Sequence, residues 1–241
     1  MPVATLSLFR FTAPMSRLWV IGQMALARRA LRQDSRLRFF KLCGSGTGEG
    51  FTPRPNWQVW AIVAVWASEK AARDAVSDSP VWQRWRARAR EVWTVFLDPL
   101  SVRGSWSGVS PFLGESGRSE AVSGPVAALT RATLRPSRAL RFWQRVPDIS
   151  SAIGKNPDVL FKIGVGEMPL LHQVTFSIWP DSTTMAAFAR AKGPHAEAIR
   201  AVREGNWFAE ELYARFRILG SEGLWGGTDP LADKLAEREA A

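Results

Sequence analysis

Hydrophobic and polar positions follow two periods along the chain, and the same succession of periods occurs twice. A period of two predicts strands, and apolar residues at every third or fourth position predict helices. The first half predicts strands at Ala4–Phe11, Leu37–Cys43, Trp57–Trp66 and Glu91–Leu97, with helices at Ser16–Arg32 and Ser68–Val76. The second half predicts strands at Val126–Leu134, Val159–Ile163, Leu171–Trp179 and Leu212–Leu219. Its helices are expected at Ser137–Ile153, kinked near Pro147, and at Ser182–Arg203, with a break.

Both halves therefore have the order βαββαβ, which is typical of ferredoxin-like units. Short sequence matches support the repeat: Phe40-Lys41-Leu42 with Phe161-Lys162-Ile163, and Glu91-Val92-Trp93 with Glu211-Leu212-Tyr213. We expect an α+β protein whose tandem ferredoxin-like repeats form a pseudo-twofold dimeric α+β barrel within one chain. The predicted domains are a first repeat at 1–106, a Gly/Ser-rich linker at 107–125, a second repeat at 126–225 and a C-terminal tail at 226–241.

Charge and cysteine content limit the cellular compartment and the kinds of partner that are expected. A single cysteine excludes an internal disulfide and favours a reducing, cytoplasmic compartment, and no apolar stretch approaches the roughly 20 residues that span a bilayer. The net charge is +10, and residues 1–120 hold 17 Lys/Arg against 9 Asp/Glu, an excess of 8. This excess favours an anionic partner, which is a membrane surface, an acidic redox protein or nucleic acid.

Arg28, Arg29, Arg32 and the run Arg84–Arg90 are the expected docking residues for that partner. Trp82 and Trp85 interleave with the basic run. This pattern fits stacking on single-stranded nucleic acid, but it also fits a solvated helix end with surface arginines, which is the more common structure. Nucleic acid is therefore the least expected of the three partners, and binding to lipid or redox protein should weaken as salt rises.

His195 is the first candidate metal ligand. It follows Gly193-Pro194, which is typical of a first helical turn, and it shares an apolar helix face with Ile199 and Val202. A helix N-terminus disfavours added positive charge, so the imidazole should stay neutral and keep a lone pair for a metal. The matched position of the first repeat is Val81, which favours a site present in only one repeat. A hydrogen-bonded core histidine is the alternative.

The remaining candidates are weaker. His172 begins a strand in phase with Val174 and Phe176, so it is expected to face inward and is the second choice of ligand; a structural histidine is the alternative. Cys43 precedes the glycine-rich loop Gly44–Gly50, but it lacks the longer motif of a haem thiolate and is expected to be a buried structural thiol. The loop itself lacks the Gly-Lys-Ser/Thr of a nucleotide site.

Several blocks of sequence resemble the spheroidene monooxygenases of purple bacterial carotenoid synthesis. The blocks that carry this resemblance are Leu6-Ser7-Leu8-Phe9-Arg10-Phe11, Arg17-Leu18-Trp19, Gly22-Gln23-Met24, Phe40-Lys41-Leu42, residues 44–53 (GSGTGEGFTP), residues 207–216 (WFAEELYARF), Trp225-Gly226 and Asp229-Pro230-Leu231. They run nearly from end to end of the chain. Residues 103–125 and the tail after Leu231 carry none of it.

The resemblance implies haem b, molecular oxygen, reduced ferredoxin as electron donor and an acyclic carotenoid oxidised at C2 to a ketone. It also implies a dimeric α+β barrel, with the haem site in the second repeat, and suggests a peripheral place on the inner face of the photosynthetic membrane. Arg215 is then a candidate catalytic residue, since it lies in the last strand and could reach a haem propionate or oxygen; a surface arginine is the alternative. The rival functions are aldoxime dehydration or peroxidase chemistry on the same barrel, and a haemless basic binding module.

Overall fold

The structure is a computed structural model that describes residues 1–50, 52–112, 124–144, 157–190 and 205–232. Its first half contains β1 (Val3–Arg10), α1 (Pro14–Gln33), β2 (Leu37–Gly46), β3 (Pro55–Trp66), α2 (Glu69–Asp78), α3 (Pro80–Arg86) and β4 (Glu91–Gly104). Its second half contains β5 (Val126–Leu134), a helical segment at 136–144, β6 (Phe161–Gly166), β7 (His172–Trp179), α5 (Ser182–Arg190) and β8 (Phe208–Gly223).

The strands expected from the period-two pattern are present, and some are longer than expected. β2 continues through Gly44 to Gly46 and β4 continues to Gly104, because the added residues pair with β6 and β8. The helix expected at Ser137–Ile153 is described from 136 to 144, so its kink near Pro147 lies outside the described residues. The helix expected at Ser182–Arg203 is described as α5 to Arg190, and its later part also lies outside them.

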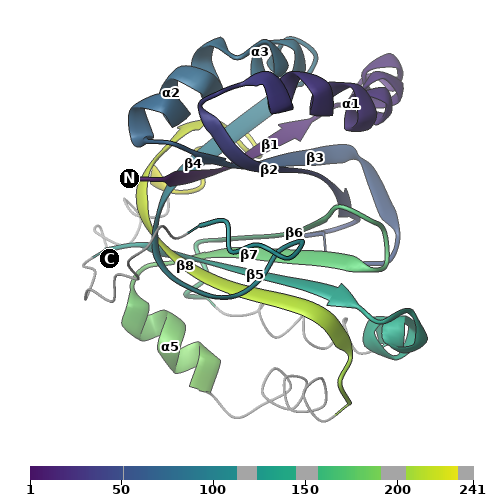
Figure 1. Ribbon diagram of the computed structural model, residues 1–241, viewed down its shortest axis with the longest axis vertical. Coiled ribbons are helices and arrows are strands. Elements are labelled where there is room, and N and C mark those ends of the chain that lie inside the picture. The colour runs from purple at the N-terminus through teal and green to yellow at the C-terminus, as the bar shows by residue number, and fades with distance from the viewer. Residues whose placement is uncertain (51, 113–123, 145–156, 191–204, 233–241) are drawn as a thin grey trace.

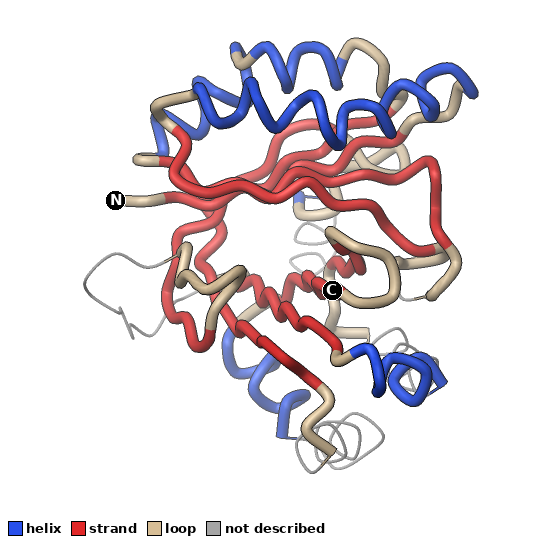
Figure 2. Tube along the Cα trace, turned by 45° about the vertical axis from the view of Figure 1, so that its right-hand side comes forward, coloured by secondary structure: helices blue, strands red, loops and turns tan. Residues whose placement is uncertain are grey.

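The strands close into an antiparallel barrel in the order β1-β3-β2-β6-β7-β5-β8-β4. Each half contributes four neighbouring strands, arranged β4-β1-β3-β2 in the first and β8-β5-β7-β6 in the second. Helices α1, α2 and α3 cover the outside of the first four strands, and α5 lies against the second four (Figure 1). Figure 2 shows the strands surrounding the centre, with helices on opposite sides. No helix in the described ranges is long and apolar enough to cross a bilayer.

Strand pairing fixes how the two halves correspond. Val3 of β1 pairs with Trp66 of β3, and Val126 of β5 pairs with Trp179 of β7. β1 is therefore equivalent to β5, and Val3 is equivalent to Val126. Leu8 then corresponds to Arg131. The inward-facing residues of both halves, including Leu6, Val63, Leu129 and Phe176, form one continuous core inside the barrel.

The sequence matches between the repeats are wrong by one residue. Lys41 lies between the inward-facing Phe39 and Cys43 and shares their phase, so it faces the interior. Lys162 instead lies between two inward residues, Phe161 and Ile163, and faces outward. The second match has the same error, because Trp93 lies in the barrel core whereas Tyr213 is exposed. A shift of one residue moves a strand side chain to the opposite face, so these letters agree without occupying equivalent positions.

Two tryptophan turns close the ends of the barrel. After β4, Trp106 forms a bridge with Val109, and after β8, Trp225 forms the same bridge with Thr228. Phe112 and Leu231, six residues after each tryptophan, are buried in the barrel core. The sequences WSGVSPF and WGGTDPL are thus a repeat that the sequence analysis divides between linker and tail. Trp106, Phe112 and Leu231 of these turns are thus part of the barrel core.

Each turn is bound to the opposite half of the barrel. The backbone N–H of Ser107 donates to Glu210 at 3.1 Å, and the backbone N–H of Gly226 donates to Glu91 at 3.3 Å. Glu91 pairs with Arg10 of β1, and Glu210 pairs with Thr133 of β5. Because Arg10 and Thr133 are equivalent positions, Glu91 and Glu210 are equivalent as well. The two contacts are therefore one interaction repeated about the pseudo-twofold relation.

A short seam joins β2 to β6, and ion pairs cross it in both directions. Only Gly44 with Gly166 and Ser45 with Val165 are paired there. Lys41 Nζ lies 2.7 Å from Glu167 Oε1, and Lys162 forms the reciprocal ion pair with Glu49. The glycine-rich loop approaches closely: a Cβ on Gly50 would lie 1.9 Å from the carbonyl oxygen of Gly164. This close approach explains a glycine in a loop that has no nucleotide motif.

Beneath the Trp106 turn, a network of buried charges fills the end of the barrel. Arg131 is 1% exposed and forms an ion pair with Glu210, and its Nη2 lies 3.6 Å from Glu167 Oε2. Glu210 also accepts hydrogen bonds from Ser105 Oγ at 2.9 Å and from the backbone N–H of Gly108 at 2.8 Å. The network thus balances the charge of Arg131, whose Nε has no hydrogen-bond partner among the described residues, and holds the turn in place.

We expect Glu210→Gln to lower the free energy of unfolding by at least about 2 kcal/mol, because it leaves the buried Arg131 without its closest counter-charge. The value should fall at the low end of the range for broken buried pairs, since Glu167 stays nearby. Urea unfolding followed by circular dichroism measures it. The first half supplies a matched control: Arg131→Leu places the residue of the equivalent position, Leu8, there, and the double variant should recover part of the loss. A loss below about 0.5 kcal/mol for Glu210→Gln would contradict this.

Candidate functional site

The outer face of the first sheet is completely covered by helices. Thr5 and Ser7 of β1 are fully buried, and each accepts a hydrogen bond from an indole: Trp66 Nε1 to Thr5 Oγ1 at 2.9 Å, and Trp82 Nε1 to Ser7 Oγ at 3.0 Å. Trp82 comes from α3, so the helix layer reaches the strands directly. Large side chains fill the space between the helices and strands β1 and β3.

The outer face of the second sheet is lined by small and hydroxyl side chains. In one row Ala128 of β5 pairs with Ser177 and Arg215, and in the next row Thr130 pairs with Thr175 and Tyr213. Ala128, Thr130 and Thr175 are half-buried, Ser177 is 8% exposed, and Tyr213 and Arg215 are exposed. The bulky residue of this face is Trp179, at one end of β7, which is buried and donates to Ser177 Oγ at 3.0 Å.

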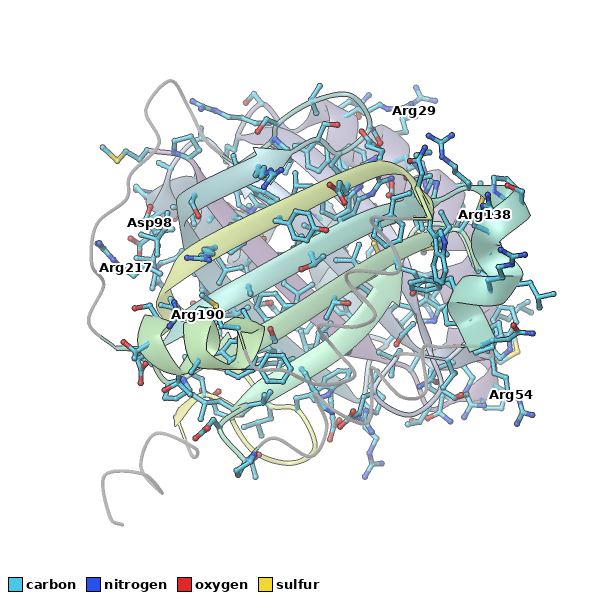
Figure 3. The ribbon with its side chains drawn as sticks, turned by 90° about the horizontal axis from the view of Figure 1, so that it is seen from below. Arg29, Arg54, Asp98, Arg138, Arg190 and Arg217 are labelled. Atoms are coloured by element: carbon cyan, nitrogen blue, oxygen red, sulfur yellow. The ribbon has the colours of Figure 1, made fainter. Side chains whose placement is uncertain are left out.

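The described helices of the second half lie at the two ends of these strands. α5 packs on Val126 and Trp179 at one end. The segment 136–144 reaches the other end, where Phe142 lies 6.2 Å from Phe208 between ring centroids. Figure 3 shows this face with the two helices on opposite sides of it. The rows that contain Thr130 and Arg215 lie between them.

Arg215 occupies the position that Phe96 occupies in the first half. Phe96 pairs with Thr5 as Arg215 pairs with Ala128, and Thr5 and Ala128 are equivalent. Phe96 is fully buried, with the guanidinium of Arg73 4.5 Å from its ring. Arg215 is exposed and has no ion-pair partner among the described residues. It faces away from Leu212 and Phe216, which lie in the barrel core, and its catalytic role stays a prediction.

His172 lies on the inward face, at the charged end of the barrel. It continues the inward phase of Val174 and Phe176, as the sequence predicts. Its Nδ1 is buried, lies 3.5 Å from Glu167 Oε2, and has no hydrogen-bond partner among the described residues. His172 and Arg215 therefore lie on opposite faces of the same sheet, and the structure does not bring these two candidates together.

The charges around His172 hold it neutral and keep its neighbours ionised. Burial lowers the pKa of His172, and Arg131 and Lys41 add to the effect, while Glu167 acts in the opposite direction. Burial would raise the pKa of Glu210, but hydrogen bonds from Gly108, Ser105 and Ser107 and the charge of Arg131 lower it to about 2. The site at this end is a neutral imidazole inside a network of permanent charges.

This network was missed by the sequence analysis. Arg131 lies two residues after Leu129 and four after Ala127, so it shares their inward face, and strand phase alone places it in the barrel. Glu210 likewise lies two residues before the inward-facing Leu212. The sequence could not show which carboxylates pair with Arg131. Strand phase identifies the buried charge, but only the closed barrel brings Glu210 and Glu167 next to it.

His195, the first candidate ligand, lies outside the described residues. Cys43 is confirmed as a buried thiol inside the barrel, and burial raises its pKa well above the usual range, so it is no thiolate ligand. Within the described ranges, no group of three or more His, Cys, Asp and Glu side chains is placed to hold a metal ion. The described candidates therefore do not form a metal centre by themselves.

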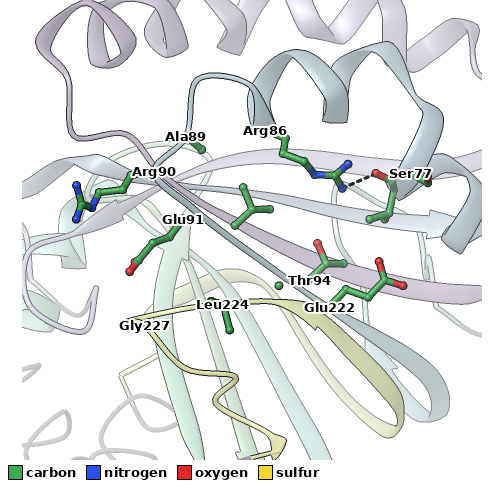
Figure 4. Close-up of a pocket in the computed structure, with 12 residues that line it drawn as sticks. Ser77, Arg86, Ala89, Arg90, Glu91, Thr94, Glu222, Leu224 and Gly227 are labelled. Atoms are coloured by element: carbon green, nitrogen blue, oxygen red, sulfur yellow. Dashed lines mark hydrogen bonds between the residues drawn. The ribbon is translucent and has the colours of Figure 1, made fainter.

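A hollow of about 760 Å³ lies at the rim of the barrel, where α2 and α3 meet β4 and the end of β8 (Figure 4). Charged side chains line it, namely Arg86, Arg90, Glu91 and Glu222. Arg86 donates to the carbonyl oxygen of Val76 at 2.8 Å, and Glu91 pairs with Arg10 at 2.9 Å. A rim of charges does not suit a long hydrocarbon chain, so we do not assign the substrate to this hollow.

The outer face of the second sheet is the described surface that could contact a cofactor. Ala128 and Thr130 are half-buried there, whereas the equivalent Thr5 and Ser7 of the first sheet are fully buried. Arg215 offers a guanidinium that could pair with a carboxylate such as a propionate. The face by itself offers hydroxyls and a cation but no imidazole, so an iron ligand must come from another part of the chain.

Comparison with solved structures supports the barrel fold. An aldoxime dehydratase, OxdRE, in complex with butyraldoxime is similar with a TM-score of 0.65 and 11% identity, covering 95% of this chain and 85% of that one. A second aldoxime dehydratase has a TM-score of 0.60 and 9% identity, covering 90% of this chain and 81% of that one. At these identities the likeness concerns the fold alone.

Sequence relatives are much closer. The spheroidene monooxygenase of Rhodobacter capsulatus is 59% identical over 241 residues, which is all of both chains. That of Cereibacter sphaeroides is 54% identical over 239 residues, covering 99% of this chain and 73% of the relative. That of Rubrivivax gelatinosus is 37% identical over 215 residues, covering 89% and 82%. No family model matches the chain. Identity of this extent, over the whole length, shows that the chain belongs to the spheroidene monooxygenase family.

Proposed function

We propose that the protein is a haem-dependent monooxygenase that oxidises an acyclic carotenoid at C2 to a 2-keto product. The oxygen comes from O2 and the electrons from reduced ferredoxin. Membership of a family whose relatives are named spheroidene monooxygenase supports an oxygenase acting on such a carotenoid. Two successive hydroxylations at one carbon would give a geminal diol, which loses water to leave the ketone.

The observation that carries the cofactor proposal is the difference between the two sheets. Phe96 is buried beneath α2 in the first half, whereas the equivalent Arg215 is exposed beside small side chains in the second. A guanidinium where the other half has a buried phenyl ring favours a ligand that carries negative charge, such as a haem propionate. We assign haem b to this face of the second half.

His195 is the proposed iron ligand. In the sequence match between the two halves, His195 corresponds to Val81, which is 1% exposed in the apolar layer between the first sheet and its helices. An imidazole at the corresponding place in the second half would lie on the side of the sheet that carries Arg215, whereas His172 lies on the opposite side. Haem, when bound, would supply the reductive activation of oxygen. The residues of the chain would hold the cofactor, orient one end of the carotenoid and exclude water.

Two further proposals complete this function. The shared order of four strands in each half, β4-β1-β3-β2 and β8-β5-β7-β6, supports an origin as tandem ferredoxin-like repeats. A carotenoid is dissolved in lipid, so we propose that the protein works in the cytoplasm with peripheral contact to the inner face of the photosynthetic membrane. The surface that would make this contact is argued in the next subsection.

We expect His195→Ala to lose haem binding while the barrel stays folded, since the substitution changes none of the described side chains of the barrel core. Titration of the purified variant with haem, followed by the Soret band, measures this, and circular dichroism verifies the fold. His172→Ala is the matched control and should keep the Soret band. The opposite result, with His195→Ala normal and His172→Ala without haem, would assign the ligand to the inward face.

Arg215→Ala should lower turnover about 10- to 100-fold and leave the fold unchanged, because the side chain is exposed and acts on charge at the site. Arg215→Lys should recover part of the rate, since it keeps the charge without the planar geometry. Arg54→Ala, another exposed arginine, is the control and should behave as the wild type. Steady-state rates with carotenoid decide the question, and a wild-type rate for Arg215→Ala would make it a surface residue.

The reaction itself is tested with haem-loaded protein, spheroidene, reduced ferredoxin and isotopically labelled oxygen. We expect a 2-hydroxy carotenoid first and a 2-keto carotenoid later, identified by mass spectrometry. The label should be sought in the hydroxy intermediate, because a ketone exchanges its oxygen with water. Haem-loaded protein that leaves the carotenoid unchanged but dehydrates an aldoxime, or oxidises a dye with peroxide, would replace this function by its rival.

A further inference from the structure

Helix α1 has apolar side chains on two opposite faces. Val20, Ala27 and Leu31 are buried and pack toward the first sheet. Leu18 and Leu26 point the other way and are 65% and 69% exposed. A helix that packs on a sheet with one face needs no apolar residues on its outer face, where polar residues are usual.

The exposed apolar residues of α1 all lie on its solvent side. Met15, Leu18 and Ile21 follow one another at a spacing of three residues, which places them in a row, and Leu26 lies further along the helix beside this row. Together they occupy the first three turns of a helix of 20 residues, about 30 Å long. Several large apolar side chains exposed on one side of a helix indicate an interaction site.

Arginines continue the same surface. Arg28, Arg29 and Arg32 are exposed in the last turns of α1, and residues 1–33 contain no Asp or Glu. Beside α1, the Arg88 guanidinium lies 4.8 Å from the Trp19 ring, which places the basic run after α3 next to the helix. The outer side of the first half, where α1 lies (Figure 1), thus combines exposed leucines with a strong positive charge.

The basic run cannot use its tryptophans for an outside partner. Trp82 and Trp85 are fully buried in the layer between the helices and the first sheet, while Arg84, Arg86 and Arg88 are exposed. Stacking of these indoles on nucleic acid bases would require them on the surface. The run therefore contributes charge alone.

From these contacts we infer that α1 docks the protein on an anionic lipid bilayer, lying parallel to it with Leu18, Ile21 and Leu26 inserted among the acyl chains. Arg28, Arg29 and Arg32 would contact lipid phosphates. The arginines match either an acidic redox protein or anionic lipid, but a helix with exposed apolar side chains followed by basic residues is the usual device for lying in a membrane interface, which favours lipid. The electron donor is then left to another surface.

The inference does not depend on the proposed haem chemistry, because lipid binding is measured without turnover. The full chain is mixed with vesicles of phosphatidylglycerol and phosphatidylcholine, or of phosphatidylcholine alone, and bound protein is separated by flotation. Wild-type protein should float with the anionic vesicles and be released as salt increases. Leu18→Gln/Leu26→Gln should weaken binding about tenfold or more, since two inserted side chains lose their apolar contact.

Two controls separate insertion from other effects. Leu140→Gln replaces an equally exposed leucine on the segment 136–144 of the other half and should bind vesicles as the wild type does. Arg28→Gln/Arg29→Gln/Arg32→Gln should remove the preference for anionic vesicles. Wild-type protein that stays unbound at low salt, or a Leu18→Gln/Leu26→Gln variant that binds as tightly as the wild type, would overturn the inference. So would a loss of ferredoxin binding in that variant with vesicle binding intact.

Discussion

Closure of the barrel depends on the seam between β2 and β6, where the two halves meet with the least backbone support. Two residue pairs join β2 to β6, whereas eleven join β4 to β8 on the other side. Side chains complete the seam, because the Lys41–Glu167 and Lys162–Glu49 ion pairs cross it in opposite directions. Each ion pair forms only when the strands are in one register, so the charges specify the closed form even where buried ion pairs add little net stability. Closure in turn removes the free edges of both sheets.

The sequence was sufficient to predict the strands and their order, because period-two patterns such as that of β1 depend on local burial alone. It was not sufficient to align the halves. Phe40-Lys41-Leu42 and Phe161-Lys162-Ile163 have similar sequences, but their corresponding residues face opposite sides of the sheet. Only the strand pairing shows this difference. The site shows the same division. Strand phase placed His172 inward and Arg215 outward, but the carboxylates around Arg131 and His172 come from distant segments that only the closed barrel brings together. The proposed ligand, His195, lies outside the described residues, so its placement still depends on the sequence.

The two halves use one strand arrangement for different purposes. In the first half, indoles from β3 and α3 donate to Thr5 and Ser7 and fix the helices on the sheet. In the second half, the equivalent rows carry Ala128 and Thr130, and Arg215 stands where Phe96 fills the space. Within the described residues, the first half has the more complete helix cover, and the proposed haem site lies in the other half.

The tryptophan turns have a consequence for the history of the chain. Ser107 belongs to the first half and binds Glu210 of the second, and Gly226 belongs to the second half and binds Glu91 of the first. Two separate subunits with these contacts would be an arm-exchanged homodimer, in which each protomer lends its last segment to its neighbour. Fusion of such a dimer keeps both exchanged arms inside one polypeptide. Neither half of the present chain is therefore an autonomous folding unit, since cutting between them would leave each barrel end without the arm that closes it.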